Sequence, residues 1–244
     1  MVEINEDDRQ RMIEIIRRNI VERGQHITLV TQFNNPRFAY TIGLSPTIGI
    51  ELMLLGAIMY EADDLYKILN FISERLRKFP QEREISVDSF GVFQLVESQN
   101  SWTREIMLGV FDYFKTDAVV ALQVIPDSEH MTIDVPDTSL PWNPSEQPIW
   151  RWLKEPWTWL VPEGSSAVTN LAALRGDAVT EASRWELDEW ELFAGSGPDT
   201  PQNELRVVPI ATLVGADSSL VDVLSLDVGK SLWRLSNGDA WHDW

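Results

Sequence analysis

A run of prolines between residues 126 and 162 constrains the fold of this chain more than any other sequence feature. The segment contains seven prolines: Pro126, Pro136, Pro141, Pro144, Pro148, Pro156 and Pro162. Proline lacks a backbone N–H and clashes with the preceding helical turn, so no long helix or central strand runs through this segment. We therefore expect two units, residues 1–162 and 163–244, with a short linker at residues 163–166.

The first unit shows helical and strand patterns in alternation. Apolar residues at helical spacing predict helices from the cap at Asn5 to Gly24 and over residues 65–76, where Pro80 ends the pattern. Residues 102–114 form a further amphipathic stretch. Strands are predicted for residues 26–32, 38–44, 51–57, 84–88, 92–97 and 118–125. This order predicts an α+β fold with a mainly antiparallel sheet and two to three helices.

The second unit is shorter and also mixes both element types. Its β-rich runs predict strands at residues 178–185, 189–194, 207–213 and 231–235. A short helix is expected from its cap at Asp217 to Leu224. The sequence thus predicts a smaller α+β module after the proline-rich segment.

Negative charge and tryptophan are concentrated in the second half of the chain. Ten of the eleven tryptophans lie between Trp142 and Trp244. Residues 1–120 contain 13 Lys and Arg against 18 Asp and Glu, whereas residues 121–244 contain 7 against 20. The net charge of −18 repels nucleic acid and anionic lipid. An acidic, Trp-rich surface is typical of a protein that attracts a basic protein partner and holds it with aromatic anchors.

The absence of certain residues and motifs indicates the cellular compartment of the protein and the kinds of activity to expect. There is no cysteine, and the start of the chain lacks the basic and apolar regions of a signal peptide. The apolar run at residues 48–60 contains Glu51 and is shorter than the roughly 20 residues of a membrane-spanning helix. We therefore expect a cytoplasmic protein. No nucleotide-binding or nucleophile motif is present, so we expect no cofactor and favour a non-enzymatic role.

One acidic loop contains residue types that bind metals. Asp127, Glu129, His130 and Asp134 together could hold a divalent cation through oxygen and imidazole. Acidic loops after strands are also common without any ligand, and the three histidines of the chain show no helical metal-pair spacing. We favour the solvated loop and predict no metal site.

A motif in the first unit resembles that of a known family. The sequence Phe38-Ala-Tyr40-Thr41-Ile-Gly43-Leu44, followed by Glu51-Leu52 and Gly56, is similar to the signature of a bacterial family of unknown function, the one numbered four-two-six-two. A later Gln-Val strand with Pro-Asp and Pro-Trp matches extends the resemblance over roughly the first 150 residues. The family's His-Pro pair is replaced here by Gly49 and Ile50, which argues against an active site at this loop.

The Tyr-Thr-x-Gly-Leu segment has two interpretations. A strand that ends in a close-packed glycine turn explains it structurally, because Tyr40 and Thr41 then point to opposite faces. Alternatively, Tyr40, Thr41, Gly43 and Glu51 form a ligand groove at that turn. The first interpretation is the more common role of such segments.

The second unit resembles a small domain of immunity proteins from bacterial polymorphic toxin systems. The resemblance rests on Asp188-Glu-Trp190-Glu-Leu-Phe193 with Gly195, on Arg206-Val-Val-Pro209, and on Arg234 with Gly238. The Asp-Ser-Gly-Trp step that is usual there is replaced by Leu187-Asp188-Glu189-Trp190. The resemblance implies that the protein neutralises a toxin by binding it.

Candidate partner-binding residues come from two segments. The first is the tryptophan cluster of Trp152, Trp157 and Trp159, which either faces a partner or joins the two units. The second is a group of acidic residues around the 189–194 strand, namely Glu186, Asp188, Glu189 and Glu191. Tryptophans inside predicted strands are expected to lie in the core, namely Trp185, Trp190 and Trp233.

Three functions remain open from sequence. The leading one is an immunity or inhibitor protein that binds a basic toxin or effector domain. The second is a small-molecule enzyme or sensor with a groove near the turn at residues 40–43. The third is a scaffold subunit that forms a homo-oligomer through its Trp-rich segment.

Overall fold

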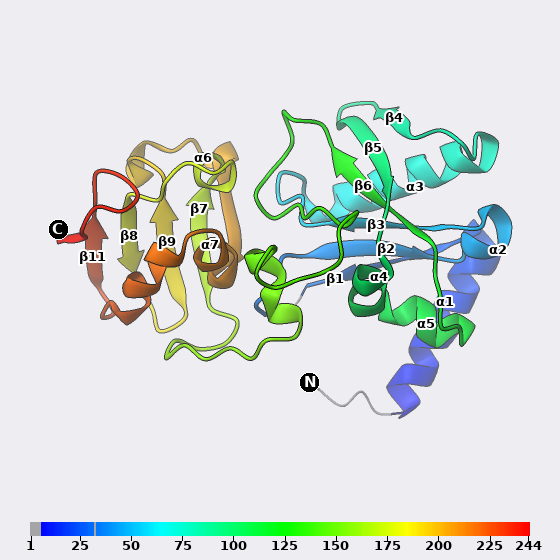
Figure 1. Cartoon of the computed structure of the whole chain (residues 1–244), viewed down its shortest axis with the longest axis horizontal. Coiled ribbons are helices and arrows are strands. Elements are labelled where there is room, and N and C mark those ends of the chain that lie inside the picture. Colours follow the sequence, from blue (N-terminus) through cyan, green and yellow to red (C-terminus); the bar gives the residue numbers. More distant parts are fainter. Residues whose placement is uncertain (1–5, 32) are drawn as a thin grey trace.

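The chain folds into two β-sheets, each packed with its own helices. The computed structural model describes residues 6–31 and 33–244. The first sheet and its helices lie on one side of the molecule and the second sheet on the other (Figure 1). The predicted α+β class is confirmed. The expected cap at Asn5 and the strand end at residue 32 lie outside the described residues.

The first sheet contains six strands in the order β1-β2-β3-β6-β5-β4. Neighbours run antiparallel except for β3 and β6, which are parallel. The predicted strands at these positions are thus present, with shifts of a few residues at their ends. The strands are β1 (His26–Val30), β2 (Phe38–Ile42), β3 (Glu51–Leu55), β4 (Glu84–Val87), β5 (Gly91–Glu97) and β6 (Ala121–Pro126).

Helices cover both faces of this sheet. Helix α3 (Ala62–Lys78) packs on the face that carries Leu52 and Leu54. The opposite face carries Met53 and Leu55 and is covered by α1 (Glu6–Arg23), α4 (Asn100–Ile106) and α5 (Leu108–Phe114). Burial on both faces explains why β3 is apolar from Leu52 to Leu55. None of the helices in the described parts of the chain has the length and apolar character needed to cross a membrane.

The second sheet also has six strands, in the order β10-β7-β9-β8-β11-β12. Strands β7 and β9 are parallel, and the other neighbours are antiparallel. The strands are β7 (Ser166–Asn170), β8 (Glu181–Arg184), β9 (Glu189–Phe193), β10 (Leu205–Pro209), β11 (Lys230–Trp233) and β12 (His242–Asp243). The shorter helical elements here are α6 (Leu171–Leu174), α7 (Ile210–Ala216), η2 (Gly197–Asp199), η3 (Gln202–Glu204) and η4 (Ser218–Ser225).

Some elements differ from the sequence prediction. Strand β7 begins inside the expected linker at residues 163–166 and occupies a central place in the second sheet. The expected strand at residues 207–213 ends at Pro209, and helix α7 follows at once. Proline ends the strand because it lacks the N–H that a further ladder hydrogen bond needs. The connection between the predicted strands at residues 38–44 and 51–57 contains the short helix α2 (Ser45–Ile48).

A short 3-10 helix in the proline-rich connection binds both units together. Helix η1 (Pro148–Leu153) inserts Trp150 into the first core, where its ring lies 6.2 Å from Phe38 and 5.9 Å from Trp102. The indole N–H of Trp150 donates to the Asp134 carbonyl at 3.0 Å. On its other side η1 meets α7, where a Cβ added at Gly215 would lie 2.9 Å from the backbone of Ile149.

Candidate functional site

The helices α6, α7 and η4 pack on one face of the second sheet. Alternate side chains of β9, Trp190 and Leu192, point into the second core together with residues of α7 and η4. Glu189 and Glu191 therefore point to the opposite face, because successive strand residues alternate. On that face Val207 remains 64% exposed although it is apolar. The sheet thus presents an open face to solvent.

A groove of about 580 Å³ crosses this open face. Its acidic residues are Glu181 and Glu191, and its aromatic residues are Trp185, Phe193 and Trp244. The described residues that line it include no Lys, Arg or His. We call this feature the acidic groove. Carboxylates beside flat aromatic rings suit a ligand that combines positive charge with apolar side-chain stems.

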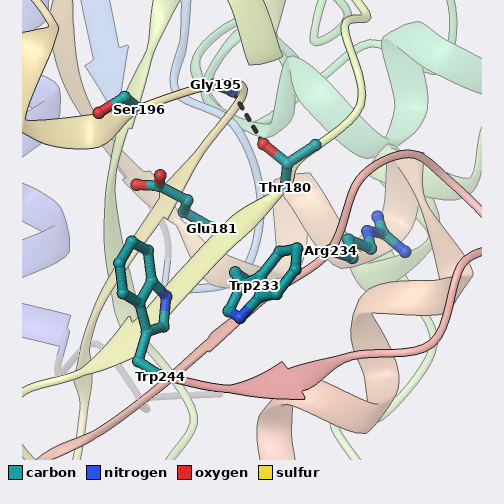
Figure 2. A pocket seen from close by; sticks show the side chains of 7 residues that line it. All are labelled: Thr180, Glu181, Gly195, Ser196, Trp233, Arg234 and Trp244. Carbon is teal, nitrogen blue, oxygen red and sulfur yellow. Dashed lines mark hydrogen bonds between the residues drawn. The ribbon is translucent and has the colours of Figure 1, made fainter.

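The acidic groove continues into a second hollow around the ends of β8 and β11. Figure 2 shows Glu181 beside the indole rings of Trp233 and Trp244, while Arg234 points away from them. The Glu181 carboxylate accepts a hydrogen bond from the Gly197 N–H at 2.9 Å, which fixes its position on the strand. Arg234 instead pairs with a carboxylate on the core side of the sheet, so it does not neutralise Glu181.

The predicted acidic residues lie on or next to this face. Glu191 lines the acidic groove, and Glu189 is exposed two positions earlier on the same face of β9. Glu186 and Asp188 are exposed in the turn between β8 and β9. Of these four residues only Glu191 lines the groove, and the other three precede it on β9 and in the turn before that strand.

The tryptophans in and near the predicted strands differ in their burial. Trp190 is 1% exposed and belongs to the core, as predicted. Trp185 is 54% exposed and lines the acidic groove, so the prediction that it lies in the core is wrong. Trp233 is half-buried and faces the hollow beside Glu181, so its predicted place in the core is wrong as well. The reason is strand geometry: Trp185 follows Glu181 and Ser183 at every second position and so shares their open face.

The predicted tryptophan cluster lies elsewhere. Trp152, Trp157 and Trp159 are half-buried, and the last two pack against the second core, under the covered face of the sheet. The rings of Trp152 and Trp157 meet at 5.1 Å, and the Trp157 indole N–H donates to the Val161 carbonyl at 2.8 Å. The structure therefore does not bring the cluster together with the acidic residues. Its contacts favour the interpretation that it joins the two units.

The Tyr-Thr-x-Gly-Leu segment surrounds a buried carboxylate. Tyr40, Thr41 and Glu51 are 4%, 0% and 0% exposed. The Glu51 carboxylate accepts hydrogen bonds from the Thr41 hydroxyl at 2.6 Å and the Gly43 N–H at 2.9 Å. The N–H and hydroxyl of Ser45 also donate to it, at 2.9 and 2.8 Å. Burial raises the pKa of Glu51 despite these donors. This network favours the structural interpretation of the segment over a ligand groove.

The acidic loop after β6 is held by internal hydrogen bonds. The Asp127 carboxylate contacts the His130 ring nitrogen at 2.7 Å and accepts from the Val92 N–H at 2.8 Å. The His130 ring stacks on Tyr60 at 5.6 Å. Asp134 is buried and accepts from the Thr132 hydroxyl at 2.6 Å. No group of three or more metal-binding side chains occurs within the described ranges.

The chain belongs to the family described as Domain of unknown function (DUF4262), whose model matches residues 19–144. The match runs from the last turns of α1 to the loop after β6 and includes the Tyr40 and Glu51 network. It leaves out η1 and the whole second sheet, which carries the acidic groove. The description of the family names no activity. No curated protein and no solved structure matches the chain.

Two features of the acidic groove escaped the sequence analysis. Neither Glu181 nor Trp244 is among the partner-binding residues predicted from sequence. The signal for Glu181 was present, because the buried Ala182 alternates with the polar residues Glu181 and Ser183. Trp244 had no local signal, since its place depends on the pairing of β12 with β11.

Proposed function

We propose that this protein is a non-enzymatic binding protein that holds a basic protein partner in the acidic groove, as an immunity or inhibitor protein does with a basic toxin or effector domain. The observation that carries the proposal is the groove itself, which combines Glu181 and Glu191 with three aromatic rings and includes no basic side chain among its described lining residues. The position of the groove in the part of the chain that resembles immunity domains agrees with this role.

Long-range attraction accounts for the first step of binding. The net charge of −18 steers a basic partner toward the chain, and the acidic residues of the open face direct it to the groove. Because exposed charges are screened within roughly 10 Å at 0.1 M salt, this step depends on ionic strength.

Aromatic anchors account for the second step. Trp185 and Trp244 are 54% and 73% exposed, so both have much apolar surface left to bury against a partner. Buried tryptophans contribute most to the affinity of many interfaces, and they accept the guanidinium or ammonium group of a basic residue over the ring. The groove therefore offers charge and stacking to the same basic side chains.

The test compares two variants in which four acidic residues are replaced by amides, so that both variants have the same net charge. The groove variant replaces four acidic residues by amides: Glu186→Gln, Asp188→Asn, Glu189→Gln and Glu191→Gln. The matched control removes the same charge from exposed helix positions in the first unit: Glu14→Gln, Glu22→Gln, Asp63→Asn and Glu74→Gln. Wild type and both variants are used for affinity capture from a bacterial lysate. The captured proteins are then identified, and their association rates are measured at several salt concentrations.

We expect wild type and the control to capture the same basic proteins. The groove variant should associate more slowly and show a weaker salt dependence than the control. Equal behaviour of the two variants, or capture of acidic proteins only, would contradict the proposal. A chain that captures nothing and forms a stable dimer at high concentration would favour the scaffold interpretation instead.

A further inference from the structure

A cavity of about 220 Å³ lies between the two units and shares no lining residue with the acidic groove. Pro36, Arg37 and Ile58 contribute to it from the first unit. Val207 and Thr212 contribute from the second, at β10 and α7. Its walls are therefore largely apolar, with one cationic side chain among them.

Arg37 is a half-buried cation that forms no close ion pair with any described residue, although the carboxylates of Asp134 and Glu61 act on it from a greater distance. Its Nη2 donates to the Tyr60 carbonyl, whereas its Nε is buried and has no partner in the described chain. No carboxylate of the described residues lies within ion-pair distance of it. Burial accordingly lowers the pKa of Arg37. Because a buried N–H that lacks a partner is unfavourable, such a group indicates an occupant that accepts hydrogen bonds.

The nearby acid does not serve as that acceptor. Asp134 also lines the cavity and is 2% exposed. Its two carboxylate oxygens already accept from the Thr132 hydroxyl at 2.6 Å and from the Ile58 N–H at 3.2 Å. Thr212, in contrast, is 1% exposed and its hydroxyl has no partner within the described residues. The cavity thus combines unsatisfied donors from Arg37 and Thr212 with apolar walls.

We propose that this cavity binds a small aliphatic carboxylic acid, with its carboxylate on Arg37 and Thr212 and its apolar body against Ile58 and Val207. A guanidinium and a hydroxyl are suitable donors for a carboxylate. The volume is below the roughly 300 Å³ at which sites for drug-sized ligands begin, which selects a small molecule. Both units line the cavity, so the ligand stabilises their contact.

Titration calorimetry and thermal unfolding of the full chain with isovalerate test this inference. Isovaleramide has the same shape without charge, and inorganic phosphate has charge without an apolar body. We expect saturable binding of isovalerate that raises the unfolding midpoint, with at least tenfold weaker binding of the amide and of phosphate. Absence of saturable isovalerate binding at millimolar concentration would overturn the inference. So would an amide or phosphate that binds as tightly as the acid.

Two variants locate the site. Arg37→Gln should weaken isovalerate binding at least tenfold, whereas the control Arg83→Gln, at an exposed position, should leave it unchanged. If Arg37→Gln does not fold, Val207→Trp replaces it, because Val207 is 64% exposed at the cavity and a larger ring there fills it without removing the guanidinium. Wild-type affinity in a folded Arg37→Gln or Val207→Trp chain would refute the site.

Discussion

Replacing Glu51 by alanine tests whether one buried carboxylate holds the turn between β2 and β3. The change removes four hydrogen bonds, two of them from the backbone N–H groups of Gly43 and Ser45. An unsatisfied buried N–H costs about 1–3 kcal/mol, so the two together should lower the free energy of unfolding by about 2–6 kcal/mol. Urea denaturation followed by tryptophan fluorescence measures this quantity by linear extrapolation.

The matched control for this substitution is Glu97→Ala. Glu97 is an exposed acidic residue on β5 of the same sheet, so its loss should change the free energy of unfolding by no more than about 0.5 kcal/mol. A loss below about 1 kcal/mol in Glu51→Ala, with an unchanged control, would refute the view that this carboxylate holds the turn.

The same residue predicts a pH dependence of stability. Burial raises the pKa of Glu51 above its ordinary value of 4.5, so the folded chain retains a proton that the unfolded chain releases. Stability should therefore fall as the pH rises from 4.5 through the folded pKa, by about 1.4 kcal/mol for each unit by which the pKa is raised. The difference in unfolding free energy between wild type and Glu51→Gln isolates this effect, because the amide does not titrate. A difference that does not change with pH, or that grows in favour of wild type, would contradict it.

Two further substitutions test the packing described above. Trp150→Ala should lower the free energy of unfolding by about 3–5 kcal/mol, because the ring is 1% exposed between both units; a urea series that also includes Trp150→Phe separates ring packing from the lost hydrogen bond. Gly56→Ala should destabilise far more than Gly49→Ala in thermal unfolding, because both glycines have positive φ but only at Gly56 would the new Cβ collide with the Asp134 carbonyl. Equal midpoints for the two glycine variants would show that this close approach is not rigid.

Local patterns were sufficient to locate most elements of the first unit. Helix α3 has its apolar residues on one face and basic residues in its last turn, and both signals are local. The strands β2 and β3 are buried at every position because the sheet is covered on both faces. In these segments the local sequence pattern and the tertiary packing favour the same element, so the predicted helix and strands agree with the structure.

Long-range pairing decided the elements that the sequence did not reveal. Strand β7 has the sequence Ser-Ala-Val-Thr-Asn, which is short and partly polar, and it is stabilised by pairing with β9 and β10 on either side. The residues of α7 are β-branched or apolar and locally favour a strand, yet their helix places Ile210, Leu213 and Val214 in the second core. Tertiary packing therefore overrode local propensity in both cases.

The candidate site was predicted only in part for the same reason. Clustered charge indicated Glu189 and Glu191 as candidates, and the alternation of strand residues, which is local, places both on the open face of β9. The groove between them and Trp244 depends on strand order within the sheet, which no short pattern specifies. Composition therefore indicated the kind of surface but not its position.

The way η1 is held between the two units limits how this chain can be divided. A cut at residue 162 would keep η1 with the first unit but remove α7, whose Gly215 lies against Ile149. Ile149 is 8% exposed in the whole chain, and the truncated fragment would present it to water beside Trp150. Loss of either unit thus exposes an apolar surface on the other unit, which favours aggregation. Genetic fusions and truncations should therefore keep both sheets in one polypeptide.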